Sequence, residues 1–313
     1  MHADELDIPE GLVRRLVDAQ FPQWAGEPLV RVSTWGTDNA MYRLGDELVV
    51  RLPRRAGNVA ALRKELTWLP RLAPHLASRA DGSAEGASRR HASRTQRVAI
   101  PVPVAAGSPG DGYPWEWAVY RWLEGTPALE ASIDYHRLAA DLAEFVERLQ
   151  AVELPETRPA GSRGVPLAER DEMVRARIPE LAGEFDTAEV TAAWDHALAA
   201  PPWGGRPVWL HGDLMPTNLL IDGAGGLAAV VDWGTCTTGD PACESLAGWM
   251  SLDVESRGSF RALLGLDDAT WARARGWALS CAVMALPYYR ETYPAFADLA
   301  RRTLETVLAD DVE

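Results

Sequence analysis

Apolar positions recur with a helical period at the start of the chain and with a strand period soon afterwards. In residues 9–22 a proline precedes apolar side chains spaced along one face, which predicts a helix. Three short β-type runs follow, at residues 28–33, 40–44 and 47–52. Because Gly45-Asp46 between the last two is typical of a tight turn, these runs predict an antiparallel meander.

The pattern changes twice more along the chain. Residues 58–76 predict a long helix, whereas residues 78–97 lose all apolar periodicity and are rich in Ser, Gly, Ala and Arg. We interpret 78–97 as a flexible insertion, with a basic docking segment as the alternative. Strand-like runs return at 98–106 and 116–123, and the chain beyond is helical apart from three short β runs at 208–210, 219–222 and 228–232.

This order of elements predicts an α+β protein of two lobes with a cleft between them. We expect an N-terminal antiparallel sheet lobe over residues 1–120, a hinge at 121–126, and a helical C-terminal lobe over 127–313.

Composition narrows the class of protein. With 47% hydrophobic and 24% charged residues in a chain of 313, disorder, collagen and coiled coil are excluded. The three cysteines have neither disulfide-framework nor zinc-site spacing, which favours a reducing cytoplasm. The N-terminus lacks the basic and apolar regions of a secretory signal, and the apolar stretch 277–289 is too short to span a bilayer. We therefore predict a cytoplasmic location and no membrane insertion.

The net charge of −14 is unevenly distributed, since residues 123–313 carry 31 acidic and 15 basic side chains. Such a surface argues against binding to nucleic acids and to anionic membranes.

The segment 208–244 carries the strongest chemical signal. His211, Asp213 and Asn218 form the pattern H-x-D-x-x-x-x-N, and Asp232-Trp233-Gly234 follows an apolar strand. This is the spacing of a kinase catalytic loop followed by a DFG-like metal element. Asp213 is the candidate acceptor of the substrate's proton, and His211 is expected to position the loop.

Asn218 and Asp232 are hard oxygen donors of the kind that Mg²⁺ prefers, and a hairpin of short strands would bring them together. The H-x-D-x-x-x-x-N pattern and the Asp-Trp-Gly stretch are each weak evidence alone. Both in this order, with strands between them, specifically indicate a kinase. The structural alternative is a degenerate, inactive kinase fold.

The stretches HGDLMPTN (211–218), VVDWG (230–234) and GDP (239–241) resemble the aminoglycoside phosphotransferases, antibiotic kinases with a protein-kinase-like fold. The resemblance extends over nearly the whole chain. It implies that fold, ATP or GTP as donor, magnesium, and a small-molecule hydroxyl as acceptor.

The resemblance also assigns nucleotide-binding residues. Arg51 stands on the third strand where the family has a phosphate-binding cation, with Glu65 as its helix partner; ordinary surface charges are the alternative. Trp35, Gly36 and Thr37 lie at the family's nucleotide-positioning loop, although a plain hairpin turn fits too. Arg121 and Leu123 are expected to contact the purine through their main chains.

The acidic helical lobe is where this family places its acceptor, so we expect a cationic acceptor such as an aminoglycoside or basic peptide antibiotic. Solubility is the alternative reason for the acidity. Candidate acceptor contacts are Glu244, Asp253, Asp171 and Glu172, and Asp240 is expected to be structural. Two other functions stay open: a metabolic or macrolide-type kinase of the same fold, and a nucleotide-binding pseudokinase.

Overall fold

A computed structural model describes residues 5–32, 38–77, 98–153, 159 and 161–310. The chain divides into two compact units, one formed by residues 1–125 with 228–234 and the other by residues 126–227 with 235–313. The predicted insertion at 78–97 lies outside the described residues, as do Trp35, Gly36 and Thr37.

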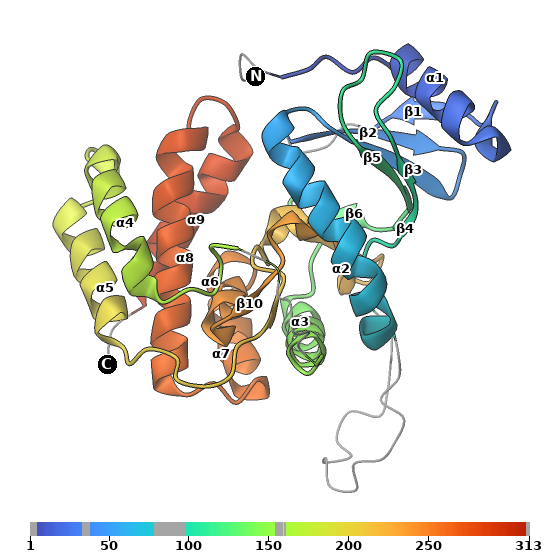
Figure 1. Ribbon diagram of the computed structural model, residues 1–313. Coiled ribbons are helices and arrows are strands. Elements are labelled where there is room, and N and C mark those ends of the chain that lie inside the picture. The colour runs from blue at the N-terminus through green and yellow to red at the C-terminus, as the bar shows by residue number, and fades with distance from the viewer. Residues whose placement is uncertain (1–4, 33–37, 78–97, 154–158, 160, 311–313) are drawn as a thin grey trace, which may run out of the picture. The chain divides into compact units, whose positions relative to one another are not determined.

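The first unit contains a five-stranded antiparallel sheet in the order β1-β2-β3-β5-β4 (Figure 1). Its strands are β1 (Leu29–Arg31), β2 (Asn39–Leu44), β3 (Leu48–Pro53), β4 (Pro103–Gly107) and β5 (Trp117–Arg121). Its helices are α1 (Glu10–Gln20) and α2 (Val59–Ala77), with 3-10 turns at η1 (Pro22–Trp24) and η2 (Ala56–Asn58). The predicted meander is confirmed, because β2 pairs with both β1 and β3 in antiparallel register.

The pleat of β3 sends successive side chains to opposite faces of the sheet. Val50 and Leu52 pack in a core with Val13 and Leu16 of α1. Arg51 belongs to the other face, where it bonds to Glu65 of α2. The central strand thus has an apolar side toward α1 and a charged position toward α2.

The strand predicted at 98–106 is shorter than expected, since β4 begins at Pro103. Pro101 and Pro103 have no N–H to donate to a ladder, which limits pairing here. Ala99 instead forms an isolated bridge with Ala229 of β9 (Leu227–Val230), and this bridge ties residues 228–234 to the first unit.

The second unit is predominantly helical, as predicted. Its α-helices are α3 (Tyr135–Gln150), α4 (Asp171–Arg177), α5 (Thr187–Ala199), α6 (Ala247–Met250), α7 (Val254–Leu263), α8 (Asp268–Tyr289) and α9 (Pro294–Ala309). Its strands are β6 (Thr126–Pro127), β7 (Val208–Leu210), β8 (Leu219–Ile221) and β10 (Thr237–Gly239), of which β6 pairs with β8 and β7 with β10. Its 3-10 turns are η3 (Leu167–Arg170), η4 (Ile178–Leu181), η5 (Pro216–Asn218) and η7 (Pro241–Leu246). The turn η6 (Trp233–Thr235) begins in residues 228–234 of the first unit and ends at the first residue of 235–313 in the second.

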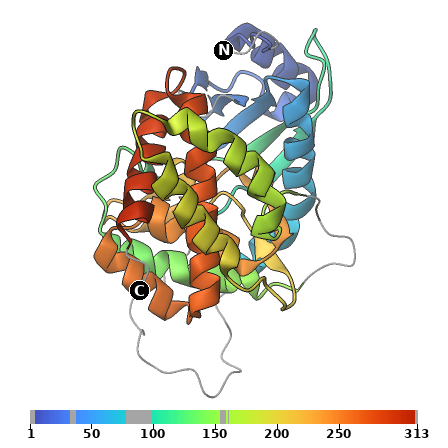
Figure 2. The same cartoon turned by 90° about the vertical axis from the view of Figure 1, so that its left-hand side faces the viewer.

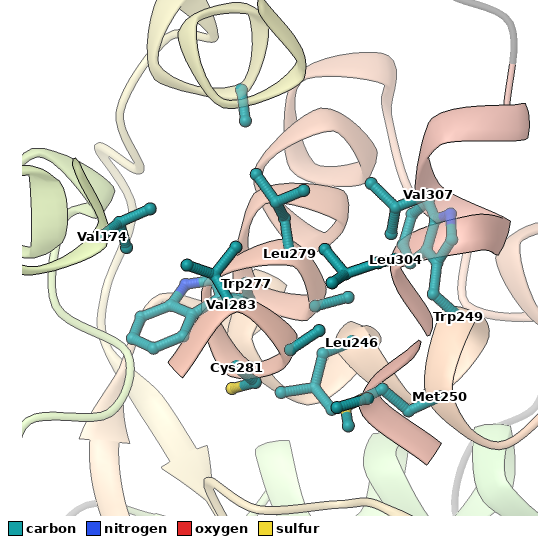
Figure 3. Packing of buried hydrophobic residues seen from close by; sticks show 14 of the residues in the cluster. Val174, Leu246, Trp249, Met250, Trp277, Leu279, Cys281, Val283, Leu304 and Val307 are labelled. Atoms are coloured by element: carbon teal, nitrogen blue, oxygen red, sulfur yellow. The ribbon is translucent and has the colours of Figure 1, made fainter. Parts of the chain in front are cut away.

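Helix α8 is the centre of this unit. Figure 2 shows α4 and α5 lying across it, and Figure 3 shows its Trp277, Leu279 and Val283 among side chains of α4, α6 and α9. Residues 273–283 of α8 are buried on all sides, and they are apolar apart from Arg273, Arg275 and Ser280. Among the helices of the described ranges, none combines the length and apolarity that crossing a bilayer requires.

All three cysteines belong to the second unit and are buried. Cys236 and Cys243 have no exposed surface, and Cys281 on α8 is 7% exposed.

Candidate active site

In the first unit, Arg51 and Glu65 form a buried ion pair. Nη1 of Arg51 lies 2.6 Å from both carboxylate oxygens of Glu65, and neither residue is more than 8% exposed. Glu65 also accepts hydrogen bonds from the Tyr120 hydroxyl at 2.8 Å and from the main-chain N–H of Trp233 at 2.9 Å. The predicted pair is therefore not an ordinary surface pair.

Burial raises the pKa of Glu65, an effect that Arg51 opposes. Burial also raises the pKa of Tyr120 above its ordinary value, and the adjacent Glu65 carboxylate adds to this increase. Burial lowers the pKa of Arg51, but the carboxylates of Glu65 and Asp232 raise it by more. The pKa of Arg51 is therefore above its ordinary value, and the guanidinium stays charged. The first unit thus holds a permanent cation at the place predicted for phosphate binding.

Arg51 also reaches Asp232, the candidate metal ligand. Its Nη2 donates to Oδ1 of Asp232 at 2.8 Å, and the Asp232 side chain is 50% exposed. Asp232 adopts a φ of +61°, a left-handed conformation that is uncommon for residues with a Cβ. Such backbone strain concentrates at functional sites, where the surrounding structure maintains it.

The predicted purine contacts lie at the end of β5. The main-chain N–H of Arg121 donates to the carbonyl of Val102 at 3.2 Å, and that of Trp122 donates to the main-chain carbonyl of Glu47 at 2.7 Å. The Arg121 side chain is exposed, with Nη1 lying 3.8 Å from Glu47. Leu123 follows directly after these bonds, and the contacts of both predicted residues with a purine stay predictions.

In the second unit, the H-x-D-x-x-x-x-N segment forms a tightly bonded loop after β7. His211 has no exposed surface, and its Nδ1 accepts a hydrogen bond from the main-chain N–H of Asp213 at 3.2 Å. Because Nδ1 is the acceptor, a neutral imidazole carries its proton on Nε2. The buried His211 side chain thus stabilises the main chain of the loop at Asp213.

The Asp213 carboxylate is held by two side chains. Asn218 Nδ2 donates to Oδ2 of Asp213 at 3.1 Å and to its carbonyl at 2.8 Å. Nη2 of Arg163 donates to Oδ1 at 2.8 Å. The Asp213 side chain is still 23% exposed, so a solute can reach it.

Glu244 of η7 contacts the main chain of the same loop. It has no exposed surface, and its Oε1 accepts from the main-chain N–H of Gly212 at 2.6 Å. Burial raises the pKa of Glu244 to about 8, with Asp213 adding to the rise and the Gly212 N–H opposing it. Its contacts are those of a group that supports the loop.

Of the other three candidate acceptor contacts, Asp253 and Asp171 have partners within the helical unit. Asp253 is the N-cap of α7, accepting from the Ser256 N–H at 2.8 Å. Asp171 accepts from the indole of Trp194 at 2.8 Å, and Glu172 is exposed on α4. Their contact with an acceptor stays a prediction.

Asp240 occupies a structural position, as expected. Its Oδ2 accepts from Nε of Arg273 on α8 at 2.7 Å, and both side chains are 5% exposed. Since Asp240 directly follows β10, which pairs with β7, this ion pair fixes the strand that leads into the catalytic loop.

Sequence reasoning missed three residues of these clusters: Tyr120, Arg163 and Asn39. The Asn39 amide oxygen, in the orientation its surroundings require, accepts from Nη2 and Nε of Arg51 at 3.0 and 3.1 Å. The strand alternation that places Tyr120 on the face of Arg51 could have identified it. No comparable signal marks Arg163, which stands in an irregular loop 50 residues before Asp213.

Solved structures similar to this chain share its fold. The GDP complex of wild-type aminoglycoside 2'-phosphotransferase-IIIa matches with a TM-score of 0.71 and 18% identity, over 96% of this chain and 99% of that chain. The streptomycin–ATP complex of APH(2")-IIa matches with a TM-score of 0.60 and 16% identity, over 92% of this chain and 95% of that chain. The apoenzyme of macrolide 2'-phosphotransferase MphH from Brachybacterium faecium matches with a TM-score of 0.57 and 21% identity, over 97% of this chain and 100% of that chain.

Among curated proteins, no sequence matches this chain significantly. A model of the phosphotransferase enzyme family matches residues 30–277, which include the β3 cation, the catalytic loop and the Asp-Trp-Gly element. The resemblance and the α+β fold class predicted from the sequence are thereby confirmed. With its sheet unit, helical unit and H-x-D-x-x-x-x-N loop, this chain belongs to the phosphotransferase enzyme family.

Proposed function

We propose that the protein transfers the γ-phosphoryl group of ATP to a hydroxyl group of an aminoglycoside or a related cationic antibiotic. The observation that carries the proposal is the folded catalytic loop, in which Asn218 and Arg163 orient the partly exposed carboxylate of Asp213. Phosphoryl transfer requires an oriented acceptor hydroxyl and neutralised phosphate charge, with little covalent chemistry from the protein.

Asp213 is the proposed general base, which accepts the proton of the acceptor hydroxyl. Arg51 is the proposed cation for the phosphates, because a charged guanidinium can bridge phosphate oxygens and Glu65 holds it in place. Arg121 and Leu123 are the proposed main-chain contacts for the purine.

Asn218 and Asp232 are the proposed magnesium ligands. The donor chemistry fits, since Asp232 presents a half-exposed carboxylate and Asn218 points its amide nitrogen at Asp213, leaving its oxygen for a metal. Magnesium, when bound, neutralises charge on the transferring phosphoryl group.

Two observations support a cationic acceptor. Residues 123–313 carry an excess of acidic side chains, which attracts cations, and solved structures of similar fold include complexes with kanamycin and streptomycin.

A macrolide-type acceptor is the second candidate. A macrolide 2'-phosphotransferase also shares this fold.

The proposal is tested by coupled ADP release with Mg-ATP or Mg-GTP and a panel of aminoglycosides, basic peptide antibiotics, macrolides and simple sugars. Drug-stimulated ADP release, with the phosphorylated product seen by mass spectrometry, supports the function and names the acceptor class. Nucleotide binding with no turnover on the whole panel contradicts it and favours a pseudokinase.

The assigned base is tested by Asp213→Ala. We expect transfer to fall by roughly 10²–10⁴-fold, because the base acts on the acceptor, while nucleotide affinity measured by calorimetry is unchanged. Asp195→Ala is the matched control, since Asp195 is an exposed carboxylate that also pairs with an arginine, Arg175. Normal turnover in Asp213→Ala would refute the assignment.

A further inference from the structure

Arg163 lies in an irregular segment before η3, yet its contacts are with the catalytic loop. Its Nη2 donates to Oδ1 of Asp213 at 2.8 Å, and its Nη1 lies 3.2 Å from Sγ of Cys281 on α8. The guanidinium therefore joins the loop to the central helix of the second unit. Its side chain is 20% exposed.

The aliphatic part of Arg163 is also built into the loop. A Cβ added to Gly212 would lie 2.9 Å from both Cβ and Cγ of Arg163, so the arginine stem packs directly on the main chain of this glycine. One residue further, the carbonyl of Gly164 accepts from the N–H of Asp240 at 2.8 Å. Stem, guanidinium and neighbouring main chain are thus all fixed, which restricts the rotamers of Arg163.

Three buried arginines of the same unit have partners that explain them structurally, whereas Arg163 is partly exposed. Arg170 donates to Ser280 on α8, Arg275 donates to the carbonyl of Val307, and Arg273 pairs with Asp240. Arg163 differs from these three because its carboxylate partner is the proposed base.

The two donors to Asp213 have different duties. Asn218 donates its amide nitrogen to Asp213, and its amide oxygen is a proposed metal ligand, so this side chain serves two groups. Arg163 has no such second duty in the proposed mechanism. A guanidinium fixed at both ends can hold Oδ1 of Asp213, and Oδ2, which accepts from Asn218, has a second lone pair that can accept a proton.

We propose that Arg163 is a positioning residue for phosphoryl transfer, which holds the Asp213 carboxylate in the orientation that accepts the proton of the acceptor hydroxyl. This inference rests on the proposed function. The proton passes from the acceptor hydroxyl to Asp213 while the acceptor oxygen bonds to the γ-phosphorus and ADP leaves; Arg163 exchanges no proton.

The test compares Arg163→Met, Arg163→Lys and Arg163→Ala with Arg170→Lys. Arg170 is a matched control because it is a buried arginine that donates to α8 one residue away from Cys281. We expect Arg163→Met to lower kcat on the order of 100-fold, as misplacement of a catalytic group does, with the nucleotide KM unchanged. Arg163→Lys should recover part of kcat, and Arg170→Lys should lower the melting temperature with kcat near wild type.

Chemical rescue separates positioning from stability. Millimolar methylguanidinium should restore part of the turnover of Arg163→Ala, since it can occupy the space beside Asp213 without repairing the fold. Wild-type kcat in Arg163→Met, or a kcat loss in Arg170→Lys equal to that in Arg163→Met, would overturn the inference.

Failure of the proposed function has a different signature. Acceptor-dependent transfer and slow hydrolysis of ATP by water are measured in parallel, because both require an oriented Asp213. If wild-type protein does neither, the proposed function fails and the inference falls with it. If wild type turns over and the Arg163 variants match it, only the inference fails.

Discussion

At the residue scale, the buried guanidinium of Arg51 determines how the carboxylates around it are arranged. Arg51 contacts two carboxylates through separate nitrogens, Nη1 with Glu65 and Nη2 with Asp232. A lysine, with one compact ammonium group, cannot reproduce both contacts. Arg51 is thus matched to this arrangement of carboxylates.

For Arg51→Lys we expect the ion pair with Glu65 to survive and nucleotide affinity to fall several-fold. Arg51→Met should destabilise the protein by about 3–5 kcal/mol, because Glu65 is left buried without its cation. The double variant Arg51→Met/Glu65→Gln should regain part of that loss in urea unfolding. Additive effects of the two substitutions would show that the pair is not coupled.

The raised pKa of Glu244 predicts a pH dependence of stability. Glutamate in the unfolded chain loses its proton near pH 4.5, whereas folded Glu244 keeps it up to about pH 8, so folding stability falls between these values. The slope from this group approaches about 1.4 kcal/mol per pH unit.

In Glu244→Gln this slope should be absent, so the variant gains stability relative to wild type as pH rises. Urea unfolding at a series of pH values checks the sign, and identical pH profiles would mean that Glu244 is ionised in the folded protein.

At the scale of elements, periodicity predicted the long helices and the meander but not the shortest strands. The missed strands β6 (Thr126–Pro127) and β10 (Thr237–Gly239) consist of Thr, Pro and Gly, whereas the predicted β7 (Val208–Leu210), also three residues long, is wholly apolar. The loop that contains Arg163 has no helical or strand periodicity in its sequence. Its position depends on tertiary packing against Gly212. The catalytic motif was readable because its residues are close in sequence, whereas the partners of Asp213 are not.

Gly212 provides a test of this packing. It has a φ of +82°, and an added Cβ would lie 2.9 Å from Arg163 and 3.1 Å from the carbonyl of Thr235. Gly183 is a matched control, since its φ is +94° but nothing lies within 4 Å of an added Cβ.

We expect Gly183→Ala to cost about 1–2 kcal/mol from backbone strain alone. Gly212→Ala should cost more and also lower kcat, because the added methyl group displaces Arg163. Equal losses of stability and normal turnover in both variants would mean that the contact with Arg163 is unimportant.

At the scale of the whole molecule, the acidity of the second part has two uses. Some aspartates are structural, since Asp134, Asp186, Asp253 and Asp267 cap α3, α5, α7 and α8. Others face solvent and contribute a long-range field that attracts cations. Charge counting from the sequence detects the total but not this division.

If the field acts on the acceptor, the KM for a cationic acceptor should rise roughly 10-fold between low and high salt. The KM for a neutral acceptor should stay constant over the same range and serves as the control. Equal salt dependence for both would assign the acidity to solubility.

The burial of all three thiols has a practical consequence. With Cys236 and Cys243 fully covered and Cys281 7% exposed, a thiol reagent modifies the folded chain only when the second unit opens. The rate of labelling therefore measures local opening of that unit without an introduced probe, and mass spectrometry of the labelled peptides tells which part opens first. Because Cys281 contacts Arg163, a bound acceptor that tightens the loop should protect this thiol before the other two.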